Sequence, residues 1–327
     1  MEFVKSEGLP IHIKSWCRDI EESAMVQAEN LARLRSYLQY GPKNPHTHIL
    51  SKKELKALKP QELVDRIRSL TSYKHRVLYY GPASEDELLA LLKEEHKVPD
   101  ALKEAPAAEQ FDFQTTETTR IYVAPYEAQQ TSIAQFSNLN EAYDVALEAP
   151  SHLYNAYFSG DMSSIVFQEM RESRSLAYGV SARVLIPNSK KRPFAYVTHI
   201  STQTDKVMDA IVAFGEIINN IPLSESAFAL AKNGAIDRLR TLRVTNSSAL
   251  WKYVNTQNMG VDVDRNKLYY DYLQDATLQD VVNFQQQQVM GHTYHYAILG
   301  DKKRLDMKAL KKMGEVIELS SKDIFGY

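Results

Sequence analysis

Apolar positions recur with two different periods along this chain, and these periods divide it into strands and helices. Alternation with a period of two predicts strands, and apolar residues three and four apart predict helices. The expected strands cover 120–126, 131–138, the sequence AYGVSARVLI that begins at 177, 193–204 and 294–299. The expected helices cover 143–158 with an interruption near Pro150, 162–174, 205–221, 224–242, 246–259 and 277–290. Strands that flank a run of helices predict an α+β fold with two layers, helices on one side of a sheet.

The first hundred residues have a different pattern. Helical spacing predicts helices at 15–38, near 51, at 60–70 and at 84–92, but only 75–80 has the pattern of a strand. A single strand cannot satisfy its own backbone hydrogen-bonding groups. We therefore expect residues 1–98 to be the partial, mostly helical end of a preceding domain, and the chain to be a fragment of a longer protein.

A stretch rich in proline, alanine, acids and threonine follows, without any sustained period, and predicts a linker at 99–118. Residues 119–327 are then a complete α+β domain. A short internal similarity supports this division: Gln61-Glu62-Leu63-Val64 leads to Tyr80-Gly81 much as Gln279-Asp280-Val281-Val282 leads to Leu299-Gly300. If this similarity is not chance, both parts end in the same way and have similar folds.

Composition narrows the class of protein more than it defines a function. The chain has 327 residues and a formal net charge of −2, so nothing favours a nucleic-acid partner. It contains no apolar run long enough for a membrane segment. One cysteine, Cys17, excludes an intrachain disulfide. The sequence leaves the cellular compartment unknown.

The nine histidines do not form a zinc-peptidase site. None of them stands in His-x-x-Glu-His, in which two histidines on one helical face bind zinc and a glutamate activates water. Glu95-His96 comes nearest, but Leu92 occupies the other ligand position. His292 and His295 lie across a predicted strand start, where a spacing of three puts the side chains on opposite faces. We therefore predict neither a catalytic residue nor a metal ligand in this chain.

One stretch, 155–184, carries the chemistry that the rest lacks. A helix that ends in the charged turn of Arg171 leads into a strand that begins with Tyr178. Both side chains donate hydrogen bonds, and arginine keeps its charge at any physiological pH, so together they suit the carbonyl oxygens of an extended peptide. The alternative from the residues alone is that Arg171 pairs with a surface carboxylate and Tyr178 fills the core.

The pattern Phe167-x-x-x-Arg171-x-x-x-x-Leu176-x-Tyr178, preceded by Gly-Asp-Met-Ser-Ser, resembles the second half of insulinase/pitrilysin-type zinc peptidases, the inverzincins. The resemblance covers about 115–320 well and 15–98 loosely. It departs from the family at 160–162, where many relatives have another glycine, and at 173–175, where many have Lys-Gly.

This resemblance implies a fold like that of the catalytic half but without zinc. It implies that Arg171 and Tyr178 bind the substrate backbone, and that zinc sits in an N-terminal catalytic half, on the same polypeptide or on a separate subunit. The chain alone is then inactive, and its partners are a peptide substrate and that half. A second hypothesis is a non-catalytic member or subunit that acts in peptide capture or assembly, and a third is an unrelated α+β interaction domain.

Overall fold

The computed structural model describes residues 9–326, and its centre is a sheet of six strands in the order β3-β4-β2-β5-β1-β6. The strands are β1 (Arg120–Pro125), β2 (Gln130–Asn138), β3 (Gly179–Leu185), β4 (Ala195–Gln203), β5 (His295–Gly300) and β6 (Glu315–Glu318). β1 runs parallel to β5 and β6, and the other neighbours are antiparallel. β3 therefore forms one edge of the sheet.

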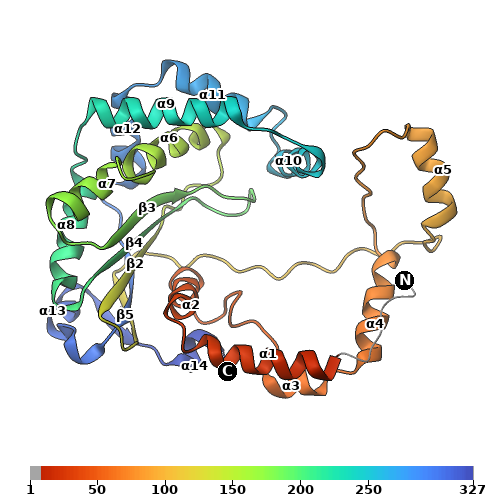
Figure 1. The fold of residues 1–327 in the computed structure, drawn as a ribbon, viewed down its shortest axis with the longest axis horizontal. Helices are drawn as coiled ribbons and strands as arrows, with labels where there is room; N and C mark the ends of the chain where they lie inside the picture. Colours follow the sequence, from red (N-terminus) through yellow and green to blue (C-terminus); the bar gives the residue numbers. More distant parts are fainter. Residues whose placement is uncertain (1–8, 327) are drawn as a thin grey trace.

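Most helices after β2 pack on one face of this sheet (Figure 1). They are α6 (Glu148–Ser159), α7 (Ile165–Phe167), α8 (Val207–Asn219), α9 (Glu225–Thr241), α11 (Arg265–Asp275) and α12 (Leu278–Phe284). α10 (Asn246–Met259) lies beyond the end of α9, apart from the sheet (Figure 1). Tyr154, Tyr157, Phe158 and Phe214, all with 0% exposure, fill the layer between helices and strands. The predicted α+β fold, with helices on a sheet, is confirmed.

The opposite face is covered in part by α2 (Gln27–Tyr40) and α14 (Ser321–Phe325). Leu34 and Leu38 of α2 are buried against Phe136 and Leu299 in a second, smaller core. The amide of Gln114 donates to the carbonyls of residues 37 and 38 and ties this helix to the chain that enters β1. A helix from the first segment thus contributes to the core of the sheet, and the domain boundary at 99–118 stays a prediction.

The rest of the first segment consists of α1 (Leu9–Ser23), α3 (Lys52–Ala57), α4 (Pro60–Ser69) and α5 (Glu85–Glu95). α4 and α5 stand away from the sheet (Figure 1). Two expectations were wrong here. The single helix at 15–38 is two helices, separated at 24–26. Residues 75–80 form no strand; the isolated bridge nearest to them in the described chain joins Tyr73 to Lys103, before this stretch begins.

The remaining differences have local causes. Pro150 does not interrupt a helix; it lies in the first turn of α6, where a missing N–H breaks no hydrogen bond. α11 was not predicted, because its tyrosines do not separate into an apolar and a polar face. Neither were β6, of four residues, and α13 (Met307–Met313). Short 3-10 turns occupy Leu70–Ser72, Val145–Leu147, Thr204–Lys206 and Lys302–Arg304, and π-helical turns Gln168–Ser173 and Gln285–Val289.

Within residues 9–326, none of the helices has both the length and the apolar character that crossing a bilayer requires.

His295 makes the stability of this sheet depend on pH. It is 1% exposed in β5, and burial, with the charge of Arg120 adding to it, lowers the pKa of its imidazole to about 4. An unfolded histidine has a pKa of about 6.5. Between these values the unfolded chain binds a proton that the folded chain does not, so the free energy of unfolding falls as the pH falls from about 6.5 to 4.

We therefore expect His295→Leu to reduce the loss of stability between pH 7 and pH 5, the rest of the loss belonging to the other histidines whose pKa burial lowers, among them His199 with a pKa of about 4. Urea titrations at both pH values measure this. The exposed His48→Gln variant serves as the control. An unchanged loss in His295→Leu would contradict the assignment.

Candidate functional site

The site begins at the short helix α7, which is held on the core by three apolar side chains. Ile165, Val166 and Met170 are 5%, 0% and 0% exposed, as their helical spacing predicts. Met162 was expected on the same face but is 72% exposed. It lies before the helix starts, in a turn that directs its side chain to the solvent.

That turn is built by Asp161. One carboxylate oxygen of Asp161 accepts hydrogen bonds from the backbone N–H of Ser163 at 2.8 Å and from the Ser163 hydroxyl at 2.5 Å. The Ser164 hydroxyl donates to the Asp161 carbonyl at 2.5 Å. Within the described chain, no side chain caps the start of α7 at Ser164. Instead these side chains close a tight turn of their own, which competes with helix formation and delays it to Ile165.

After α7 the chain widens into the π-helical turn Gln168–Ser173, which carries Arg171. Such turns are frequent at functional sites. The Met170 carbonyl then accepts hydrogen bonds from the N–H groups of Leu176 and Ala177 at 2.9 and 3.1 Å. Ser175 takes a φ of 52°, which reverses the chain. Tyr178 is fixed next, because its N–H donates to the Ser201 carbonyl of β4 at 2.7 Å.

These contacts bring Arg171 and Tyr178 together although seven positions separate them. The guanidinium carbon of Arg171 lies 5.7 Å from the centre of the Tyr178 ring and 5.0 Å from that of Phe167. Tyr178 is 69% exposed, so it does not fill the core. The nearest carboxylate to Arg171 is that of Glu172, at 3.8 Å between solvent-exposed groups. Ion pairs between solvent-exposed groups contribute little to the stability of the fold.

The neighbouring Arg174 differs from Arg171, because its guanidinium is paired with carboxylates of the protein. Arg174 donates to the Glu216 carboxylate at 2.7 Å and has Glu169 at 3.7 Å. It is used within the protein, whereas Arg171 keeps most of its donors free for a ligand. The site thus presents a permanent cation and a phenol O–H, side by side and open to solvent.

The strand that follows Tyr178 is an edge strand whose outer side is closed. Asn155 of α6 donates to the Val184 carbonyl at 3.0 Å and accepts from the Val184 N–H at 2.7 Å. The Ser159 hydroxyl accepts from the Ala182 N–H at 2.9 Å. These two side chains replace a neighbouring strand, so a peptide cannot add to β3 along 182–184. Sequence reasoning missed both, because nothing along the chain marks a residue that will face a strand edge.

Arg171 and Tyr178 can orient and stabilise a carbonyl oxygen, but they supply no general base. Among the residues that the structure describes, no three side chains of His, Cys, Asp or Glu come together as a metal site. His75 and His96 do meet, with their Nε2 atoms 2.7 Å apart, which sequence spacing did not indicate.

Sequence comparison assigns the family. Residues 74–235 match the family model described as the peptidase M16 inactive domain. This part of the chain is a peptidase M16 inactive domain. The match includes the whole site at 155–184 and ends within α9. No curated protein matches the chain by sequence.

Three solved structures have a fold similar to that of this chain. A peptidase M16 inactive domain from Pseudomonas fluorescens has a TM-score of 0.65 at 15% identity, over 91% of this chain and 71% of its own. The periplasmic protease PqqL from Escherichia coli has a TM-score of 0.67 at 14% identity, over 91% of this chain and 33% of its own. Pitrilysin has a TM-score of 0.65 at 13% identity, over 98% and 34%. The predicted family is confirmed, and the chain spans about one third of the length of PqqL and of pitrilysin.

The bonds between α6 and β3 predict a stability effect. Asn155→Ala removes both bonds to Val184 and leaves a buried N–H unsatisfied, so the free energy of unfolding should fall by about 1–3 kcal/mol. Chemical denaturation measures it. The matched control is Gln61→Ala, whose exposed amide bonds Asp65; a change of about 0.5 kcal/mol or less is expected there. An equal effect in both variants would contradict a stabilising role for the hydrogen bonds between Asn155 and Val184.

Proposed function

We propose that this chain is the metal-free C-terminal half of a zinc-dependent endopeptidase. It closes the substrate chamber and binds an extended peptide through Arg171 and Tyr178. The observation that carries the proposal is the meeting of these two donors, 5.7 Å from guanidinium carbon to ring centre, at an exposed turn of a peptidase M16 inactive domain.

The division of labour follows from the chemistry of the two side chains. The Arg171 guanidinium and the Tyr178 hydroxyl donate to backbone carbonyl oxygens of the peptide and fix its direction. Arg171 stays charged throughout, so it stabilises negative charge that develops on a carbonyl oxygen. The zinc ion, expected in the N-terminal half, would polarise that carbonyl.

The packing of the site explains its rigidity. The Arg171 guanidinium packs over the Phe167 ring, and the buried Met170 anchors the turn in the core. The Tyr178 backbone is held by β4. A preorganised pair of donors loses little freedom when a peptide binds, which favours positioning of the substrate.

Removing either donor should therefore lower the rate of peptide cleavage and leave the stability of the fold unchanged. With the catalytic half present, Arg171→Ala and Tyr178→Phe should each lower peptide turnover by about ten- to a thousandfold, the range for positioning and oxyanion-type contacts. Steady-state kinetics measure this, with unchanged thermal melts and the exposed Arg304→Gln variant as controls. Wild-type turnover in both variants would remove the assignment. If no catalytic half yields turnover and the peptide still binds, the chain is a capture subunit.

We also propose that the first segment completes its own sheet with strands from that other half. Residues 75–80 form neither a helix nor a strand, and their apolar side chains are open: Val77 is 49% exposed and Tyr80 62%. Leu70 and Leu91, on the elements that flank this stretch, are 59% and 56% exposed. Apolar side chains gathered around unpaired backbone are typical of a surface that a partner covers.

Hydrogen exchange tests this second proposal. In the chain alone, the amides of 75–80 should exchange within seconds; with the catalytic half bound they should be protected by about a hundredfold or more, as ladder amides are. Amides in β4 serve as the internal control and should stay protected in both states. Rapid exchange at 75–80 in an assembled, active enzyme would contradict it.

A further inference from the structure

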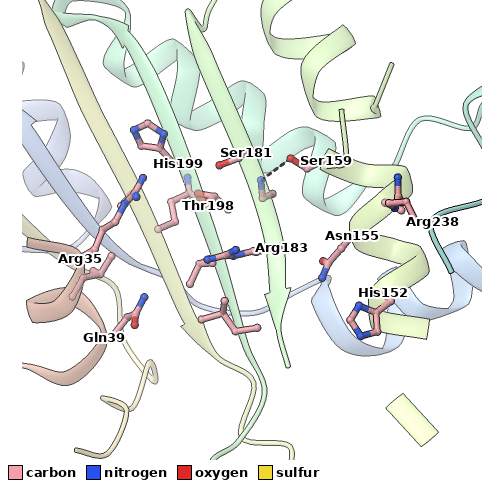
Figure 2. Close-up of a pocket in the computed structure, with 18 of the residues that line it drawn as sticks. Arg35, Gln39, His152, Asn155, Ser159, Ser181, Arg183, Thr198, His199 and Arg238 are labelled. Carbon is pink, nitrogen blue, oxygen red and sulfur yellow. Dashed lines mark hydrogen bonds between the residues drawn. The ribbon is translucent and has the colours of Figure 1, made fainter. Parts of the chain in front are cut away.

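A second polar site lies on the sheet at some distance from Arg171 and Tyr178. A cavity of about 690 Å³ opens over β2, β3 and β4, bounded by α2 on one side and by α6 and α9 beyond the edge of β3. Figure 2 shows Arg35, Arg183 and His199 lying over the strands, and Asn155, His152 and Arg238 beyond β3.

The charges around this cavity have one sign. Its lining contains three arginines, Arg35, Arg183 and Arg238, and two histidines, but within the described chain no aspartate or glutamate lines it. None of these arginines forms an ion pair among residues 9–326. An arginine cluster without acids is costly to assemble unless something neutralises it.

Burial and the neighbouring positive charges lower the pKa of two residues in this cavity. Burial lowers the pKa of Arg35, and the charge of Arg183 lowers it further. Burial also lowers the pKa of His199 to about 4, with the charge of Arg35 as a second cause, so His199 is neutral at pH 7. Its buried Nε2 has no hydrogen-bond partner in the part of the chain that the structure describes. A negatively charged group in the cavity would relieve the repulsion between Arg35 and Arg183.

The position of Arg183 connects this cavity to the peptide site. Tyr178 immediately precedes β3, and Arg183 follows it by five positions, which corresponds to about 16 Å at about 3.3 Å per residue. Because side chains alternate along a strand, an odd spacing places the two on opposite faces of the sheet, and Arg183 shares its face with His199 of β4. A peptide that contacts both residues must therefore pass around the strand and spans at least about five residues.

We propose that this cavity binds a carboxylate of the peptide, at least about five residues from the backbone carbonyl that Arg171 and Tyr178 hold. Arg35 and Arg183 donate to the carboxylate oxygens. The inference rests on the proposed function, which places the peptide at Tyr178. It adds a preference in the substrate: peptides with an acidic side chain, or a C-terminal carboxylate, at that distance.

Three fluorescein-labelled ten-residue peptides of alanine and serine test the preference. One carries a single aspartate and an amidated C-terminus, one has asparagine in place of the aspartate, and one is the asparagine peptide with a free C-terminus. At low salt the 327-residue chain should bind the aspartate peptide about tenfold more tightly than the asparagine amide, as charge-assisted hydrogen bonds require. The third peptide shows whether a terminal carboxylate serves equally. The preference should shrink as the salt concentration rises.

Variants of the cavity arginines test whether the preference for the aspartate peptide arises in this cavity. Arg183→Gln and Arg35→Gln should abolish it, and Arg304→Gln should retain it. Arg183 is exposed, so its variant should keep the fold, and a thermal melt checks Arg35→Gln, which is half-buried. Equal affinities for the aspartate and both asparagine peptides overturn the inference, as does a preference that survives in Arg183→Gln and Arg35→Gln.

Arg171→Ala separates the two proposals. If the proposed function holds, this variant weakens the binding of all three peptides and leaves the ratio between them unchanged. If the affinities do not change, the peptide site at Arg171 and Tyr178 is wrong, whereas the preference for carboxylates is judged by the two cavity variants alone.

Discussion

The closure of the free edge of β3 is the interaction on which the rest of this structure depends. Asn155 and Ser159 bond three backbone groups that would otherwise face solvent, and they bind α6 directly to the strand. The same strand is joined to β4 on its other side and begins immediately after Tyr178. Held from both sides, β3 gives the phenol and the preceding turn a fixed position, and it lets ligands approach only the end and the face of the strand.

The distribution of arginines gives this scaffold its chemistry. Arg174 pairs with Glu216, and Arg265 pairs with the buried Glu148 at 2.6 Å, so both serve the fold. Arg171 and the pair Arg35 and Arg183 have no such partners of comparable strength among the described residues. Guanidinium groups repel one another when they lie close together, which is why we propose a ligand for each group. The first group lies at the turn before β3, and the second lies between α2 and the face of that strand.

Sequence alone predicted the parts of this fold in which burial has a clear period. The strands of the central sheet other than β6, and the buried face that Val166 of α7 shares with Met170 of the following turn, followed from alternation and helical spacing. Arg171 and Tyr178 followed from the spacing of a family motif, and the structure brings them together. The predicted helix start at Met162 was wrong because the turn at Asp161 delays the helix to Ile165. The predicted strand at 75–80 was wrong because an apolar pattern states what a segment would bury, but not whether a partner is there to bury it.

Other features had no signal along the chain at all. The clamp of Asn155 on β3 joins residues 29 positions apart, and the cavity combines Arg35 with Arg183 across two segments of the chain. Such contacts depend on which helix lies beside which strand. Topology decides this, and local pattern does not report it.

Photo-cross-linking with an extended peptide that carries one diazirine-bearing leucine tests the central claim most directly, because it leaves every side chain of the protein intact. Mass spectrometry of the cross-linked chain then gives the positions that the bound peptide touches. The account predicts adducts at Phe167–Gly179, lost when unlabelled peptide competes. Adducts confined to the exposed apolar residues of 70–91, or spread evenly over the surface, would contradict it.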